Sequence, residues 1–111
     1  FVIVPIAGDY YSHEGVIDLN ESLQKATRGN PSLQVLGYLM TRFDIRTRIS
    51  KQSLDLMKEK YGDLAFSSVI RELAAIKSSP ALRLTVYEFE PNGDGAADYT
   101  AFTEEVVERL A

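Results

Sequence analysis

The sequence predicts an α/β protein built on a parallel sheet. Two apolar runs, FVIVPI at residues 1–6 and LQVLGYLM at 33–40, are typical of strands covered on both faces. Each is followed by a segment whose apolar residues recur at helical spacing, and a third short run, FSSVI at 66–70, continues the alternation. Strand–helix alternation favours parallel strands with right-handed crossovers. We therefore expect one sheet between helical layers.

Capping and turn residues divide the first part of the chain. Pro5 has no amide hydrogen to donate to a ladder, so we expect it at the end of the first strand. Asp9 or Ser12 can cap the first helix. Ser50 is a suitable N-cap for the second helix, and Gly62 predicts its C-terminal stop.

The second part of the chain gives weaker patterns. Residues 71–79 are predicted to be helical or irregular, and residues 82–89 (LRLTVYEF) to be extended. PNGDG at 91–95 predicts a turn. A last helix is expected over about 96–110. Its apolar face would carry Tyr99, Phe102, Val106 and Leu110.

Composition limits the kinds of site that the chain can hold. The absence of cysteine excludes a disulfide framework and a thiolate metal site. His13 is the single histidine, at an expected helix start, and we interpret it as structural or exposed rather than catalytic. Asp9, Glu14 and Asp18 are too scattered to predict a metal site. Because the formal net charge is −4, anion binding would need a local basic surface.

One segment, residues 38–52 (YLMTRFDIRTRISKQ), gathers cationic side chains between a predicted strand and a predicted helix. The carboxyl ends of strands in open α/β sheets are where ligands bind, and arginines there can hold phosphate. Asp44 can hold Arg46 or Arg42 in position, or cap the loop. The alternative is a solvated loop whose charges serve solubility. The cationic residues are Arg42, Arg46, Arg48 and Lys51.

Several motifs in this order resemble one family. They are VIVPIAGDYYSHEG, then NPSLQVLGYLMTRFDIRTRIS with T-x-x-D-x-R-T at residues 41–47, then YEFEPNGDGAADYTAFTEEVVERL. Together they cover essentially the whole chain. The chain resembles the C-terminal half of ParA-type partition ATPases, deviant-Walker P-loop proteins related to Soj and MinD. The resemblance implies a three-layer P-loop NTPase-like fold, of which this chain would hold the C-terminal half only.

The resemblance also implies a function. Such proteins bind ATP with Mg²⁺, form a homodimer in the ATP state, bind DNA non-specifically and respond to a ParB-like partner protein. They distribute plasmids, chromosomes or other cargo in the cytoplasm, on the nucleoid. The P-loop and the Mg²⁺ ligands would lie upstream of residues 1–111, so the chain alone should not hydrolyse ATP. We expect it to be the C-terminal part of a single ATPase domain, also because Phe1 leads directly into a buried-type strand.

Residue by residue, the resemblance implies three sites. Thr41 and Asp44 match the loop beside the nucleotide base. Ile70 and Arg71 match an isoleucine–proline step that lines the adenine pocket, although Arg71 replaces the proline. The loop near the dimer interface corresponds to Pro5 and Asp9. The positions of basic residues that contact DNA phosphates correspond to Arg46, Arg48, Lys77 and Arg83, where Arg83 and Thr85 replace a usual glycine and proline.

Two alternatives stay open at this stage. A non-catalytic interaction module could have kept the fold and lost nucleotide binding, an alternative favoured by Arg71 and by the loss of the usual glycine at position 83. A MinD-like relative that cycles on a membrane would need a last helix with a basic polar face. Glu104, Glu105 and Glu108 beside the single Arg109 argue against it, so no membrane partner is expected.

Overall fold

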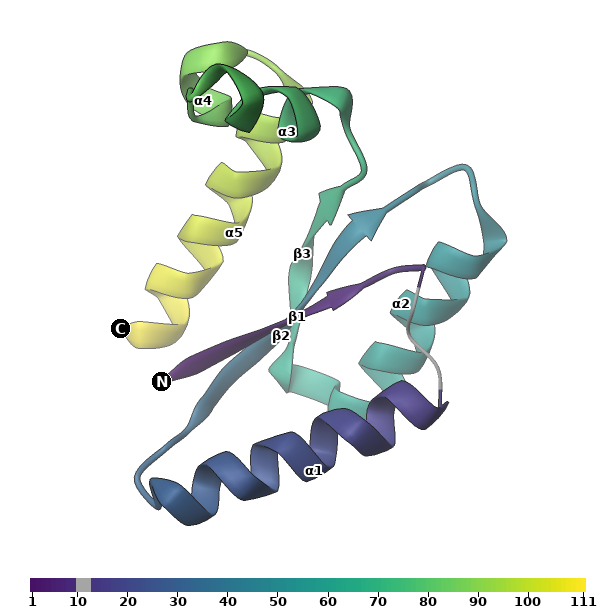
Figure 1. The fold of residues 1–111 in the computed structure, drawn as a ribbon, viewed down its shortest axis with the longest axis vertical. Coiled ribbons are helices and arrows are strands. Elements are labelled where there is room, and N and C mark those ends of the chain that lie inside the picture. Colours follow the sequence, from purple (N-terminus) through teal and green to yellow (C-terminus); the bar gives the residue numbers. More distant parts are fainter. Residues whose placement is uncertain (10–12) are drawn as a thin grey trace.

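A computed structural model describes residues 1–9 and 13–111, without the side chains of His13 and Glu14. The predictions made for His13 and for Ser12 as a cap lie outside the described residues. Figure 1 shows a sheet crossed by helices on both sides. The elements are β1 (Val2–Ala7), α1 (His13–Gly29), β2 (Val35–Phe43), α2 (Arg48–Tyr61), η1 (Gly62–Leu64), β3 (Ala65–Arg71), α3 (Ala74–Ser78), η2 (Pro80–Leu82), α4 (Val86–Phe89) and α5 (Asp94–Leu110).

The sheet has the strand order β1-β2-β3, and both pairings are parallel. The prediction that Pro5 ends the first strand was wrong, because Pro5 lies inside β1 opposite Leu39. Within the described residues β1 has a neighbour on one side only, and a strand with an open side tolerates proline. The pairing of β2 with β3 is irregular between Tyr38 and Met40 and again between Met40 and Phe43.

Two hydrophobic cores lie on opposite faces of the sheet. On one face, Leu19 and Leu23 of α1 and Met57 of α2 pack against Tyr38, Met40 and their neighbours in the sheet. On the other face, Leu36, Leu39, Phe66 and Ile70 pack against Tyr99, Phe102 and Val106 of α5. The sheet is therefore the middle layer of three, and the predicted fold class is confirmed.

The N-cap of α2 is Thr47 and not, as predicted, Ser50. The Thr47 Oγ1 atom accepts a hydrogen bond from the Ser50 amide at 3.3 Å. Ser50 lies inside the first turn, is 1% exposed, and its hydroxyl accepts from the Asp44 amide at 3.1 Å. The predicted stop at Gly62 is confirmed, with φ of 56°, a left-handed value that favours glycine.

The prediction of an extended segment over residues 82–89 was wrong. Pro80 begins the short helix η2, and Arg83 closes it with a φ of 58°. Thr85 and Glu88 then form a reciprocal capping box at the start of α4. These local signals outweigh the β propensity of the Leu-Thr-Val-Tyr sequence.

The last helix, α5, begins at Asp94, two residues earlier than predicted. Leu110, expected on its apolar face, is 53% exposed, whereas the other three predicted residues pack on the sheet.

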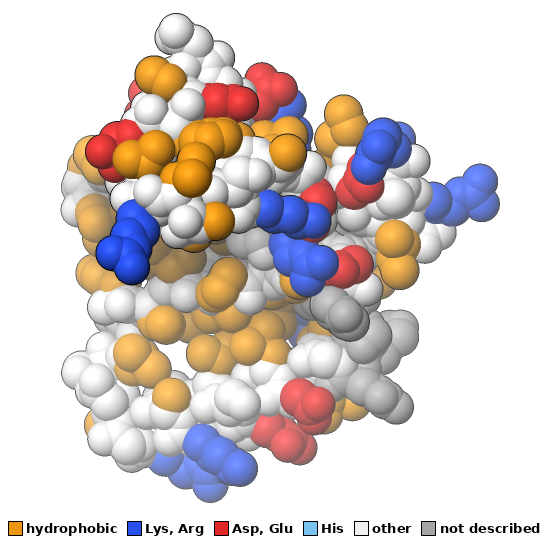
Figure 2. All heavy atoms as spheres, turned by 45° about the horizontal axis from the view of Figure 1, so that its top comes forward, with side chains coloured by type: hydrophobic (Ala, Val, Ile, Leu, Met, Phe, Trp, Pro, Cys, Tyr) orange, Lys and Arg blue, Asp and Glu red, His pale blue; other side chains and the backbone are white. Residues whose placement is uncertain are grey.

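The molecule is more open than its mass requires. Its accessible surface is 7371 Å², whereas a self-contained monomer of this mass exposes about 6,100 Å². The radius of gyration is 14.9 Å, compared with about 13 Å for a compact chain of this length. Hydrophobic side chains are visible across the middle of the face in Figure 2.

Candidate functional site

Charged residues within or just after the ends of all three strands meet at the carboxyl edge of the sheet. Arg42 Nη2 lies 3.4 Å from Asp9 Oδ2, next to the end of β1. Arg42 Nε lies 3.1 Å from Glu72 Oε2, at the first residue after β3. Lys77 Nζ, on α3, lies 2.9 Å from the other oxygen of Glu72. Figure 2, which turns this end of the molecule forward, shows positive and negative side chains next to one another.

The network holds the Glu72 carboxylate in its charged form. The hydrogen bonds from Lys77 and then from Arg42 lower the pKa of Glu72. All four charged side chains retain solvent access, from 23% for Glu72 to 68% for Lys77. This edge can therefore exchange its partners with a ligand or with a second protein.

Hydrogen bonds among its own polar groups stabilise the loop after β2. The Asp44 carbonyl accepts from the Thr47 amide and hydroxyl, each at 3.0 Å. The Asp44 carboxylate accepts from the backbone and the guanidinium of Arg46, at 3.0 Å for each bond. These bonds lower the pKa of Asp44. The prediction that Asp44 holds an arginine of the loop is confirmed for Arg46.

The loop after β1 is fixed against the loop after β2. The Gly8 amide donates to the Thr41 carbonyl at 2.8 Å, and the Thr41 hydroxyl donates to the Ile6 carbonyl at 3.4 Å. A side chain at Gly8 would lie 3.2 Å from Met40 Sδ and 3.3 Å from Ser50 Oγ. The close approach brings Asp9 beside Arg42.

At the end of β3, Arg71 contacts α5. Its amide donates to Asp98 Oδ2 at 3.0 Å, a bond that proline could not make. Its guanidinium is bidentate to the same carboxylate, at 2.8 Å for the shortest contact, and Asp94 lies 3.5 Å away. The preceding residue, Ile70, is 3% exposed and packs in the core. The arginine at position 71 thus anchors the end of β3 to α5.

The basic residues predicted to contact DNA lie at three places. Arg46 and Arg48 share the loop and the first turn of α2, and the Arg46 side chain is 84% exposed. Lys77 lies at the carboxyl edge of the sheet, where it forms an ion pair with Glu72. Arg83 is exposed in the turn between η2 and α4. Pro5, predicted near a dimer interface, is exposed within β1, away from the strand end where Asp9 lies.

Sequence reasoning missed Glu72, interpreted Ser50 as a helix cap, and named Arg42 only among the cationic residues of the loop and as a possible partner of Asp44. A usable signal existed for the two charged residues. Arg42 lies two residues after the apolar run at 33–40 and Glu72 two residues after the run at 66–70, so parallel strands carry both to the same edge. Ser50 gave no such signal. Its hydroxyl is buried because Thr47 is the cap of α2, which places Ser50 inside the first turn of the helix.

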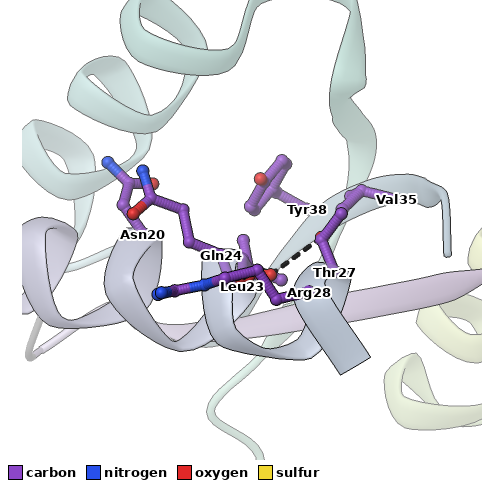
Figure 3. Close-up of a pocket in the computed structure, with 7 residues that line it drawn as sticks. All are labelled: Asn20, Leu23, Gln24, Thr27, Arg28, Val35 and Tyr38. Atoms are coloured by element: carbon purple, nitrogen blue, oxygen red, sulfur yellow. Dashed lines mark hydrogen bonds between the residues drawn. The ribbon is translucent and has the colours of Figure 1, made fainter. Parts of the chain in front are cut away.

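A hollow of about 550 Å³ lies between α1 and the first half of β2 (Figure 3). None of the predicted site residues lines it. Tyr38 lies on its sheet side and stacks on Tyr61 with ring centroids 3.6 Å apart. Burial, and then the proximity of Tyr61, raise the pKa of Tyr38. The lining residues are Asn20, Leu23, Gln24, Thr27, Arg28, Val35 and Tyr38.

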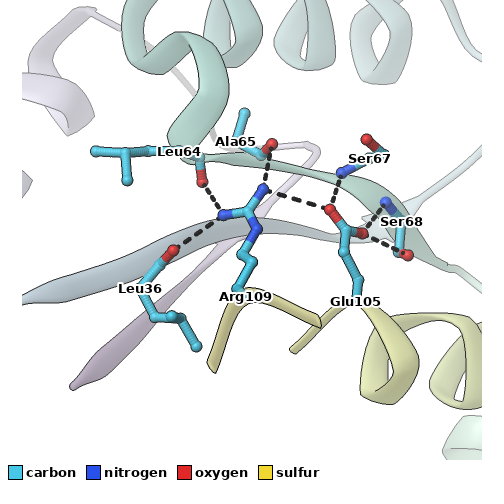
Figure 4. Close-up of polar contacts among 7 residues, drawn as sticks. All are labelled: Leu36, Leu64, Ala65, Ser67, Ser68, Glu105 and Arg109. Atoms are coloured by element: carbon cyan, nitrogen blue, oxygen red, sulfur yellow. Dashed lines mark hydrogen bonds and ion pairs between the residues drawn. The ribbon is translucent and has the colours of Figure 1, made fainter. Parts of the chain in front are cut away.

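At the amino edge of the sheet, Arg109 and Glu105 of α5 form hydrogen bonds with backbone groups of the strands and of η1 (Figure 4). Arg109 donates to the carbonyls of Leu36, Leu64 and Ala65 at 2.9 to 3.0 Å. Its guanidinium carbon lies 3.9 Å from the centre of the Phe66 ring. Glu105 accepts from both serine amides of β3 at 2.8 and 2.9 Å, and from Arg109 at 3.3 Å. This cluster is structural.

Sequence comparison gives a consistent set of relatives, although no protein-family model matches the chain. The chromosome-partitioning ATPase Soj of Thermus thermophilus is 33% identical over 110 residues, which is 98% of this chain. The chromosome partitioning protein ParA of Myxococcus xanthus is 24% identical over 109 residues. The chain is a relative of the Soj and ParA partition ATPases.

The fold of this Soj and ParA relative matches a solved structure, the cell division ATPase MinD of Pyrococcus furiosus. The TM-score is 0.67 at 20% identity over 98% of this chain. The chain spans 44% of the Thermus Soj, 38% of the Myxococcus ParA and 43% of the MinD chain. None of the helices in the described residues of this chain combines the length and the apolarity that crossing a membrane requires.

Proposed function

We propose that the chain is the C-terminal part of an ATP-dependent partition ATPase. The observation that carries the proposal is the meeting of three strand ends at one edge, where Arg42, next to Thr41 in the chain, forms ion pairs with Asp9 after β1 and Glu72 after β3. Ligands of open α/β sheets bind at this edge. The relationship to Soj and ParA supports ATP as the ligand. The large exposed surface supports a domain that continues beyond this chain.

Thr41 and Asp44 would lie beside the nucleotide base, and the backbone of Ile70 and Arg71 would form the adjoining wall. The residues fit a base in part. The Asp44 carboxylate is 24% exposed and keeps its charge, but it is already bound to Arg46. The phosphates and Mg²⁺ would be held by residues outside this chain. Bound ATP would supply the hydrolysable phosphoanhydride, while this chain's residues orient the base.

In this proposal the protein dimerises with ATP through the region of Pro5 and Asp9, binds DNA non-specifically, and responds to a ParB-like partner. Arg46 and Arg48 are the DNA contacts with the strongest support, because both are exposed and they lie two residues apart in the chain. Lys77 and Arg83 would extend the contact. Since the chain carries a net charge of −4, DNA would approach this local surface only. The cytoplasm, with the nucleoid, is the compartment that this activity requires.

The test is the double variant Arg46→Ala, Arg48→Ala in the full-length protein, with ATP present. Each phosphate interaction that the substitutions remove should reduce the slope of log affinity against log salt concentration by about one. We expect weaker DNA retention with unchanged ATP affinity. The double variant Lys25→Ala, Arg28→Ala on α1 is the charge-matched control. Unchanged DNA affinity of the loop variant at low salt would exclude the DNA role.

A second candidate is a non-catalytic interaction module, favoured by one observation. Arg71 replaces the expected proline and is bound to Asp98, so the wall of the adenine pocket differs from the pattern of the family. ATP titration of the full-length protein decides between the two. Saturable ATP binding supports the ATPase, whereas no binding together with an upstream sequence that lacks a P-loop lysine supports the module.

A further inference from the structure

Arg42 has a backbone conformation that its sequence position does not predict. It lies within β2 with a φ of 50°, in the left-handed region that side-chain-bearing residues avoid. The pairing of β2 with β3 shifts register between Met40 and Phe43, on either side of Arg42. Strained residues of this kind persist where the surrounding structure fixes them, and they concentrate at ligand sites and switch regions.

The contacts of Arg42 explain what fixes it. Separate nitrogen atoms of its guanidinium face two carboxylates, Nη2 toward Asp9 and Nε toward Glu72. Glu72 is held in turn, because its amide donates to the Phe43 carbonyl at 3.0 Å and Lys77 binds its second oxygen. Arg42 therefore connects the segments that follow β1 and β3, and a planar fork with several donors is suited to this.

We propose that Arg42 is a positioning residue that couples nucleotide binding to dimerisation, an inference that rests on the proposed function. Its two carboxylate partners belong to different sites of that function. Asp9 is in the segment proposed to lie near the dimer interface, and Glu72 follows the wall of the base pocket. Arg42 itself lies between Thr41 and Asp44, so a base that shifts this loop moves the guanidinium relative to Asp9.

If these ion pairs only stabilised the fold, removing Arg42 would lower folding stability and would not change how one site responds to the other. The Arg42 and Asp9 side chains are 53% and 39% exposed, and ion pairs between exposed groups contribute little to folding stability. Removing Arg42 should thus leave the thermal unfolding midpoint nearly unchanged. A coupling residue instead changes the affinity of one site according to the occupancy of the other.

The experiment uses the full-length protein, with ATP affinity measured at low protein concentration and dimerisation measured by sedimentation with and without ATP. Arg42→Asn is the main variant, because asparagine tolerates a left-handed backbone. We expect its ATP affinity to change less than about threefold, while the ATP-induced gain in dimer affinity falls about tenfold. Arg42→Lys should restore only part of that gain. Arg28→Asn on α1 is the matched control.

A second test changes the two carboxylates that Arg42 contacts. In an Asp9→Asn and Glu72→Gln double-mutant cycle, the effects on ATP-induced dimerisation should be non-additive with Arg42 present and additive in the Arg42→Asn background. Normal ATP-induced dimerisation of Arg42→Asn would overturn the inference and leave the proposed function intact. Failure of the wild-type protein to bind ATP would overturn the proposed function itself.

Discussion

The two edges of the sheet use charged residues in opposite ways. At the amino edge, Arg109 and Glu105 are 20% and 16% exposed, and most of their partners are backbone groups. At the carboxyl edge, Arg42 and Lys77 are 53% and 68% exposed, and they form ion pairs with side chains on separate segments. The first arrangement fixes a helix to a sheet. The second leaves charged groups within reach of solvent and of a ligand.

Burial explains the difference. Burial alone would raise the pKa of Glu105, but the hydrogen bonds from Ser67 and Ser68 and the nearby Arg109 together lower it. A charge that is partly removed from water remains only if such partners compensate it. At the carboxyl edge, the ion pairs of Arg42 with Asp9 and of Lys77 with Glu72 each include a cation that is more than half exposed, so they can rearrange at lower cost. The Arg71–Asp98 pair at the same edge is 29% and 11% exposed and, like the Arg109–Glu105 pair, fixes α5 to the sheet.

The largest expected effect on folding stability comes from placing a methyl group at Gly37, where it would collide with the Arg109 side chain. A methyl group at Gly37 would lie 2.4 Å from Arg109 Nη1, 2.5 Å from Phe66 Cε2 and 2.8 Å from the Leu64 carbonyl oxygen. We expect Gly37→Ala to lower the free energy of unfolding by about 3 kcal/mol, measured by urea denaturation. Gly29→Ala is the control, since nothing lies within 4 Å of its added methyl. Equal stability of the two variants would contradict the packing at this edge.

A smaller effect is expected from neutralising Glu105. Its pKa is below the ordinary value of 4.5 in the folded protein, so its charge stabilises the fold above that value, and the contribution is lost as pH falls through the lower folded-state pKa. Glu105→Gln should be less stable by about 2 kcal/mol at pH 7. The difference from wild type should shrink on acidification. Glu104→Gln, at an exposed neighbour, should show no such trend.

The smallest effect is expected at the carboxyl edge. Lys77→Ala removes one of the ion pairs of Glu72, with a predicted loss of stability below about 1 kcal/mol that decreases further at high salt. Thermal denaturation at two ionic strengths measures it. A loss as large as that of Glu105→Gln would show that the two edges do not differ in the way described.

The sequence predicted the elements whose signal lies in apolar periodicity. The three strands, the long helices and the stop at Gly62 needed no tertiary information. The error at Ser50 arose where two neighbouring polar residues compete for the same role, and the error at residues 82–89 arose where capping signals compete with β propensity. Thr47 and Ser50 are both capping residues, and the choice between them follows from the path of the loop. Thr85 and Glu88 formed a capping box inside a segment of high β propensity.

The candidate site was predictable in its location but not in its connections. The position after β2 followed from chain order, and the pair of Asp44 with Arg46 is local in sequence. The contacts of Arg42 with Asp9 and Glu72 join residues that are far apart in the chain, and they depend on strand register and on a left-handed backbone. Neither can be read from composition or spacing.

The bonds between Glu105 and β3 have a consequence for how the sheet can grow. Two consecutive amides of β3, those of Ser67 and Ser68, are already bound to the Glu105 carboxylate. A further strand would need free donors in that stretch to pair there, as would another molecule that aggregates edge to edge. Additional strands are therefore expected to pair with β1. The Glu105 side chain of α5 protects β3 from pairing with other molecules.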